Sequence, residues 1–205
     1  MQGQNGKRRC IFAPRKLAVF PSSKRNMKTI EIRESPLTLE LAKQHLRVGS
    51  TPDNDTIIAA KLDMAIAVAE DMTGRTIRAK KVVFDVLIPT DTPIVRLPVP
   101  TMQIERLAVS RSSIPQQNYT LLEDDYEPML VTEPEYCGQR IAVTAIIGYD
   151  KDTIPPAIAA AILLILGTLY DNESDNLVGR SVSELSLTAE KLLLPWRVLP
   201  YGHVR

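Results

Sequence analysis

Four acidic side chains that lie close together in the sequence are the first candidates for chemistry. Glu123, Asp124, Asp125 and Glu127 could hold a divalent cation, because hard cations prefer carboxylate oxygens as ligands. An adjacent acidic run in a segment bounded by prolines is more often a solvated turn. We therefore predict no metal site in this segment.

Other side chains that could support catalysis are few and scattered. The two histidines, His45 and His203, are far apart, and no HExxH, CxxC, P-loop, GxSxG or dinucleotide-binding glycine motif occurs. Two cysteines, Cys10 and Cys137, are too few for a disulfide framework and favour a reducing compartment. The sequence thus predicts no catalytic residue, no metal and no cofactor.

The charge is distributed unevenly along the chain. Its 205 residues carry a net charge of +1, yet residues 1–28 contain eight basic and no acidic side chains, and the remainder has 17 basic against 24 acidic ones. A basic arm at residues 1–27 could bind nucleic acid by neutralising phosphates, although such a stretch is as often a flexible or extended tail. The candidates for DNA contact are Lys7, Arg8, Arg9, Arg15, Lys16, Lys24 and Arg25.

Two helices are predicted between residues 28 and 79. Thr38 can cap a short helix that runs to Leu46 and is stopped by Gly49, with Leu39, Ala42 and Leu46 on one face. A longer helix follows over residues 56–73, preceded by the possible N-cap side chains of Asp53, Asn54 and Asp55 and followed by Gly74 as a left-handed C-cap. Its apolar residues recur at helical spacing: Ile58, Leu62, Ala65, Ile66, Ala69 and Met72. A second helix with so few basic residues is a poor reader of DNA.

A β region is predicted over residues 80–150. From Lys80, alternate apolar residues follow the period-two pattern of a half-buried strand. Prolines separate the further candidate strands, which indicates short strands joined by turns. These strands are Ile94 to Val99, Ile104 to Ser110, Tyr119 to Leu122 and Arg140 to Ile147.

An apolar helix opens the third region, residues 151–205. Pro155 and Pro156 suit a helix start, and residues 157–170 are apolar on every face. The apolar run is shorter than the roughly 20 residues that span a bilayer, so the helix must be surrounded by its own domain or also by neighbouring subunits. A polar loop over 172–186 and a short helix stopped by Pro195 complete the region. The predicted fold is α+β: a small, mostly α-helical bundle interrupted by a β subdomain, with an extended basic N-terminal arm.

The order of these segments resembles the head-tail connector (adaptor, or head completion) proteins of tailed bacteriophages. The C-terminal third carries the resemblance most clearly, from Ile154-Pro155-Pro156 through Tyr170-Asp171-Asn172 to Pro195-Trp196-Arg197. The residues 38–48, the helix end Thr73-Gly74-Arg75 and the strand 143–149 follow the family in the same order. The resemblance covers residues 28–199, and residues 28–205 are expected to form one connector domain. The basic arm has no counterpart in the family.

The resemblance implies a non-enzymatic structural protein of the virion neck, assembled in the host cytoplasm. Such proteins form a ring, commonly of twelve subunits, at the portal vertex, where they join head to tail and extend the DNA channel. The implied partners are other copies of the chain, the portal protein and a stopper or tail-completion protein. DNA would pass through the lumen without sequence-specific binding, which suits the acidic body, and no membrane is involved.

C-terminal segments in this family commonly reach the portal, which makes the end of the chain a candidate docking segment. An equally open interpretation is that Leu193 and Trp196 fold back on the chain's own core. Two hypotheses compete with the connector: a DNA-packaging accessory protein that binds nucleic acid through its arm and, far behind, a metal-dependent enzyme. The docking candidates are Leu192, Leu193, Leu194, Trp196, Arg197 and Val198.

Overall fold

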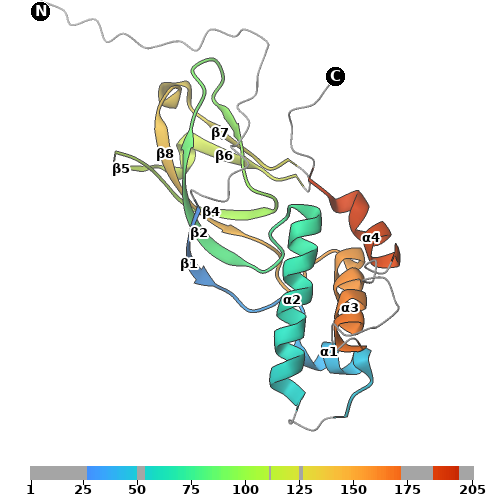
Figure 1. The fold of residues 1–205 in the computed structure, drawn as a ribbon. Coiled ribbons are helices and arrows are strands. Elements are labelled where there is room, and N and C mark those ends of the chain that lie inside the picture. Colours follow the sequence, from blue (N-terminus) through green and yellow to red (C-terminus); the bar gives the residue numbers. More distant parts are fainter. Residues whose placement is uncertain (1–26, 50–53, 111, 125–126, 172–186, 199–205) are drawn as a thin grey trace, which may run out of the picture. The chain divides into compact units, whose positions relative to one another are not determined.

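The computed structural model describes residues 27–49, 54–110, 112–124, 127–171 and 187–198. These residues form two compact units, which we describe separately (Figure 1). The β unit contains residues 27–33 and 80–148, and the helical unit contains residues 34–79 and 149–198. The predicted α+β fold, in which a β subdomain interrupts a helical bundle, is confirmed. Residues 1–26 of the predicted basic arm (residues 1–27) and the polar loop 172–186 lie outside the described residues, whereas Met27 is the first residue of a strand.

The β unit consists of two antiparallel sheets. The larger sheet has the strand order β1-β2-β8-β4-β5, and the smaller has the order β3-β7-β6. A single apolar core is formed by side chains from both sheets, among them Phe84, Leu107, Leu130 and Val143. The strand bounds are β1 Met27–Ile32, β2 Lys80–Leu87, β3 Ile94–Arg96, β4 Thr101–Val109, β5 Ser112–Ile114, β6 Tyr119–Leu122, β7 Met129–Thr132 and β8 Arg140–Ile147.

Burial explains which strands the sequence could predict. Val82, Phe84 and Val86 of β2 are buried while their neighbours are less so, as the alternation predicts. The bounds of β6 and β8 are those predicted. Three strands, β1, β5 and β7, were not predicted. Five of six residues in β1 and two of three in β5 are exposed, which leaves no apolar alternation to recognise, and β7 has only four residues.

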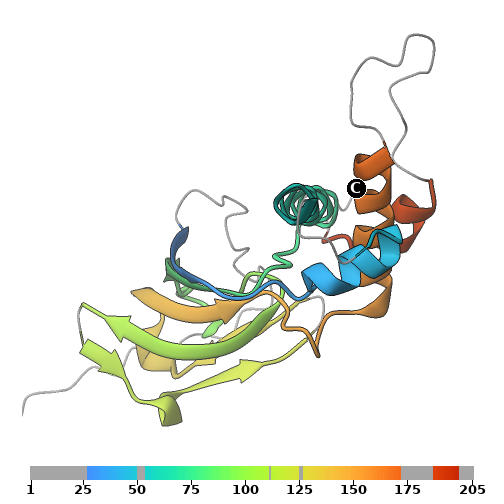
Figure 2. The ribbon, with the colours of Figure 1, turned by 90° about the horizontal axis from the view of Figure 1, so that it is seen from below.

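The helical unit packs three helices against one side of the longest one. Figure 2 views α2 nearly along its axis, with α1, α3 and α4 gathered on the same side of it. The bounds are α1 Leu39–Leu46, α2 Asp55–Thr73, α3 Pro156–Asp171 and α4 Leu187–Leu193. The core between them contains the α2 residues predicted from helical spacing, of which Met72 is half-buried and the others are buried. It also includes Ala42, Ile158, Ala161, Ile162, Ile165, Leu166, Ala189 and Leu193.

Local capping follows the sequence at two of the four helix ends in α1 and α2. The Thr38 hydroxyl accepts a hydrogen bond from the Leu41 N–H at 3.3 Å, and Gly74 is left-handed with φ 70°. The prediction that Gly49 stops α1 is wrong: the helix ends at Leu46, three residues earlier, with Arg47 in the left-handed region at φ 54°. The prediction of a side-chain cap for α2 is wrong at Asn54, which makes no such hydrogen bond, and Asp55 instead forms an ion pair with Lys43.

The apolar helix α3 is enclosed mainly by its own unit. Ile158, Ala161, Ile162, Ile165 and Leu166 are buried against α1, α2 and α4. The Lys61 ammonium lies 5.0 Å from the Tyr170 ring centroid and donates to the Tyr170 carbonyl, where a cation is favoured at a helix C-terminus. None of the helices in the described part of the chain combines the length and the apolar character that crossing a membrane requires.

Candidate functional site: the anchored C-terminal segment

The end of α2 forms a compact turn that ties it to the end of the chain. Gly74 donates from its N–H to the Glu70 carbonyl at 2.9 Å and turns the backbone through the left-handed region, which a glycine adopts at low cost. The Thr73 hydroxyl donates to the Ala69 carbonyl at 2.7 Å and accepts from the Arg75 N–H at 3.3 Å. These bonds fix the direction in which the Arg75 side chain leaves the helix.

The Arg75 side chain is buried, with 1% of its surface exposed. Its Nε donates to the Trp196 carbonyl at 2.5 Å, and a terminal guanidinium nitrogen donates to the Tyr149 hydroxyl at 3.0 Å. The guanidinium carbon lies 5.4 Å from the centroid of the Trp196 ring, within the range of a cation–π contact. One planar cation therefore holds the C-terminal segment by its backbone and its aromatic ring.

The backbone of residues 194–198 is held at a second point. After α4, Leu194–Trp196 form a 3-10 turn, which is closed by the Arg197 N–H donating to the Leu194 carbonyl at 3.2 Å. The Val198 N–H then donates to the Thr73 carbonyl at 2.7 Å. Gly74 and Val198 lie close together: a Cβ atom added at Gly74 would be 3.6 Å from the Val198 carbonyl oxygen and 3.7 Å from the Val198 Cβ. Residues 194–198 are thus a packed part of the helical unit.

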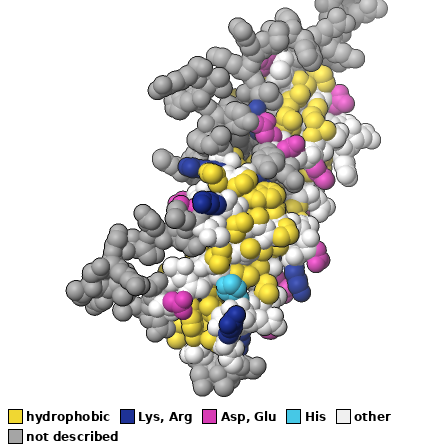
Figure 3. All heavy atoms as spheres, turned by 90° about the vertical axis from the view of Figure 1, so that its right-hand side faces the viewer, with side chains coloured by type: hydrophobic (Ala, Val, Ile, Leu, Met, Phe, Trp, Pro, Cys, Tyr) yellow, Lys and Arg dark blue, Asp and Glu magenta, His cyan; other side chains and the backbone are white. Residues whose placement is uncertain are grey.

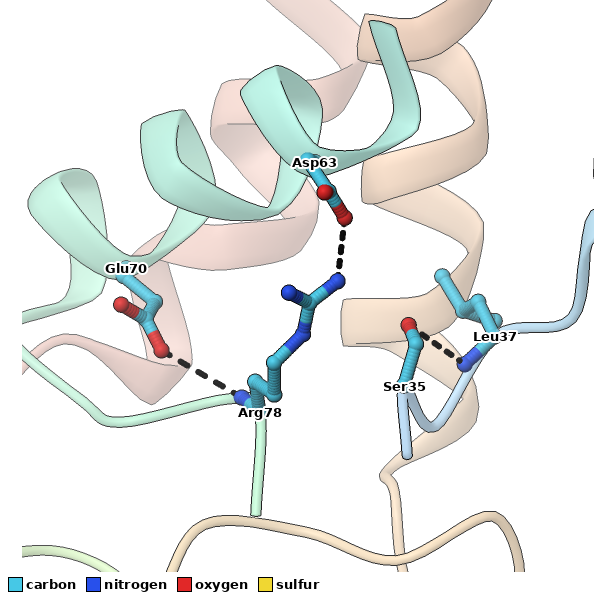
Figure 4. A network of polar contacts seen from close by, with 5 residues as sticks. All are labelled: Ser35, Leu37, Asp63, Glu70 and Arg78. Carbon is cyan, nitrogen blue, oxygen red and sulfur yellow. Dashed lines mark hydrogen bonds and ion pairs between the residues drawn. The ribbon is translucent and has the colours of Figure 1, made fainter. Parts of the chain in front are cut away.

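The chain that follows Arg75 is fixed to α2 by carboxylates. The Glu70 carboxylate accepts from the N–H groups of Ile77 and Arg78, at 2.7 and 3.3 Å, and the Arg78 guanidinium pairs with Asp63. Figure 4 shows both contacts of Arg78 beside Ser35, whose hydroxyl accepts from the Leu37 N–H ahead of α1. The backbone is therefore fixed by hydrogen bonds both before and after Arg75.

The predicted docking residues divide into an inward and an outward group. Leu193 is 2% exposed, and Leu192 and Trp196 pack against the same core, as the interpretation of a fold-back on the chain's own core describes. Leu194 is 67% exposed, and the side chain of Arg197 is also exposed. Val198 is half-buried beside Gly74. The inward residues hold the outward ones in place.

The other candidates do not form a site in the described structure. The nucleic-acid candidates Lys7, Arg8, Arg9, Arg15, Lys16, Lys24 and Arg25, together with His203 and Asp125, lie outside the described residues. His45 lies on α1 close to Gly167 of α3: a Cβ atom added at Gly167 would be 3.8 Å from the His45 Nε2. Among the described residues, no group of three or more His, Cys, Asp or Glu side chains could hold a metal ion.

The acidic segment and Cys137 have structural roles. The Asp124 carboxylate accepts a hydrogen bond from the Glu127 N–H at 2.8 Å, and the Glu127 carboxylate forms an ion pair with Arg96 at 3.1 Å. Both carboxylates therefore have partners within the chain. Cys137 takes part in a disulfide bond, which goes against our expectation of a reducing compartment without disulfides. The other cysteine, Cys10, lies outside the described residues.

Sequence reasoning missed the roles of Arg75 and Tyr149. The only signal for Arg75 is an arginine directly after a C-cap glycine, a position usually open to solvent. Tyr149 follows the last strand, and neither residue is near residues 194–198 in the sequence. Their meeting depends on the packing of α2 against α4 and could not be found from periodicity.

Comparison with known proteins shows the fold. No protein-family model matches the chain, and no curated protein matches it by sequence. A chain from the neck of an empty gene transfer agent (GTA) particle, computed with C6 symmetry, has a TM-score of 0.67 at 18% identity, over 85% of this chain and 96% of that chain. A chain from the virion of a native GTA particle has a TM-score of 0.64 at 17% identity, over 85% and 96%. A third, from the neck of a native GTA particle computed with C12 symmetry, has a TM-score of 0.60 at 16% identity, over 83% and 95%.

Proposed function

We propose that this protein is a non-enzymatic structural connector of a phage-like virion neck. The observation that carries the proposal is the shared fold: 85% of this chain superimposes on nearly the whole of a chain from a GTA particle neck. The order of sequence segments, which is typical of head-tail connectors, supports it independently of the fold. In this proposal residues 28–205 form one connector domain, whose β subdomain is residues 80–150.

The connector would form a ring at the portal vertex that joins head to tail and extends the DNA channel. The C6 and C12 symmetries of the similar neck structures support an arrangement of identical copies around an axis. Outside residues 1–28, acidic side chains outnumber basic ones by 24 to 17, and a lumen of that sign repels phosphates and lets DNA slide. The stopper or tail-completion protein would bind the other end of the ring.

The anchored C-terminal segment would dock on the portal protein. Leu192, Leu193 and Trp196 would serve as its internal supports, whereas Leu194 and Arg197 would touch the portal and Val198 would lie at the edge. An exposed leucine beside an arginine on an ordered turn can bind a shallow apolar depression with an acidic rim. Because the segment is already ordered, docking would not require it to fold first.

Portal binding by point variants tests this function. We would titrate the cognate portal with wild-type protein and with a Leu194→Asp and Arg197→Glu double variant, and measure complex mass by light scattering after gel filtration. Both side chains are exposed, so the variant should fold normally and bind portal at least tenfold more weakly. A Lys191→Glu variant, also exposed and on α4, is the control for charge. Equal binding by all three proteins would contradict docking through this segment.

A further inference from the structure

The helix α2 carries an apolar stripe on the side turned away from its own core. Ile57, Ala60, Met64 and Ala67 are exposed, and Ile57 and Met64 expose 48% and 55% of their surface. Their spacing of three, four and three residues is the a/d repeat of helices that pack on another helix. These four positions are uncharged, and the exposed Asp71 follows one turn further along the same side. In the helical unit, α1, α3 and α4 all lie on the other side of α2 (Figure 2).

A second apolar surface lies on the outer side of α3. Residues 157–170 contain no charged side chain. Ala160 is exposed, and Leu163 and Leu164, which pack partly against the core of the unit, are only half-buried. Figure 3 shows hydrophobic side chains gathered into a broad area on the face that carries α1, α3 and α4. Because α2 and α3 pack on each other through their buried faces, the outer α3 surface and the α2 stripe lie on opposite sides of the pair.

We propose that the α2 stripe of one copy packs on the outer α3 surface of the next copy, and this rests on the ring proposed above. A closed ring of identical subunits needs two different, complementary surfaces on each subunit, on sides that do not face each other. These two surfaces meet that requirement. The alanines Ala60, Ala67 and Ala160 allow two helix axes to approach to the roughly 8–10 Å of close helix packing.

The chemistry of the stripe favours a helix over other occupants. A nucleic acid would need cations to neutralise its phosphates, and the stripe offers none. One helix face of about three turns is smaller than the ~800 Å² per partner of a stable stand-alone interface. We therefore expect weak association of free subunits, which strengthens when a portal gathers them.

Complementary single variants test the heterologous contact. Met64→Lys breaks the stripe and leaves the α3 surface intact, whereas Ala160→Lys does the reverse. Both positions are exposed, so circular dichroism and melting temperature should match the wild type. Leu87→Lys, in β2 with 60% exposure, is a matched control that also replaces an exposed apolar residue. Masses would be measured by analytical ultracentrifugation across protein concentration, alone and with portal.

The expected masses distinguish the possible outcomes. Wild type and Leu87→Lys should form multi-subunit assemblies, and each lysine variant of the helical unit should assemble at least tenfold more weakly. An equimolar mixture of Met64→Lys and Ala160→Lys should stop at a dimer, because only one intact contact can form. Normal assembly by either variant would overturn the inference and leave the connector proposal standing. A wild type that does not self-associate even with portal would overturn both.

Discussion

Replacing Arg75 by alanine should release the C-terminal segment from the helical unit. The substitution removes the hydrogen bonds to the Trp196 carbonyl and the Tyr149 hydroxyl, at 2.5 and 3.0 Å, and the contact with the Trp196 ring. A hydrogen bond from a charged donor contributes about 1.5–3 kcal/mol and a cation–π contact about 0.5–2 kcal/mol. Because the released segment can find water for its carbonyl, we expect a net loss of about 3–4 kcal/mol in the free energy of unfolding.

Trp196 makes this prediction measurable, because it is the only tryptophan of the chain. Urea unfolding would give the free energy, and the emission maximum and acrylamide quenching would report on the segment. In Arg75→Ala we expect red-shifted emission and stronger quenching in the absence of urea. The control is Arg78→Ala, which removes a nearby ion pair with an exposed carboxylate and should cost below about 1 kcal/mol with unchanged emission. A loss below about 1 kcal/mol with wild-type emission for Arg75→Ala would refute the reasoning.

Other substitutions give smaller or differently placed effects. Gly74→Ala should lower the free energy of unfolding by about 1–2 kcal/mol, because alanine is strained at φ 70°; urea unfolding checks this, and no loss would contradict the left-handed cap. Thr38→Ala should cost about 1 kcal/mol in the same assay through loss of its cap on Leu41, with Thr38→Ser retaining most of the stability. Leu193→Ala should cost about 2–5 kcal/mol, because the side chain is 2% exposed, whereas Leu194→Ala should leave stability within about 0.5 kcal/mol of the wild type. Similar losses for both leucines would show that the segment is packed differently.

The sequence predicted best the longer elements along which burial is periodic. The α2 face from Ile58 to Ala69 and the alternation in β2 were readable because one side of each element is buried. The exposed strand β1 carries no such pattern, since it is stabilised by backbone pairing with β2 rather than by burial of its side chains. For the candidate site, the sequence led to the docking hypothesis for the terminal segment and left open whether Leu193 and Trp196 fold back on the core, which they do. This fold-back depends on Arg75, which lies 121 residues before its partner Trp196.

The mass of the complex with the cognate portal tests the central claim most directly. Gel filtration with light scattering would be run on the wild-type protein alone and after mixing with purified portal rings. The connector account predicts a multi-subunit complex in which many copies of this chain join each portal ring. A protein that elutes as a monomer and ignores the portal at every concentration would contradict it.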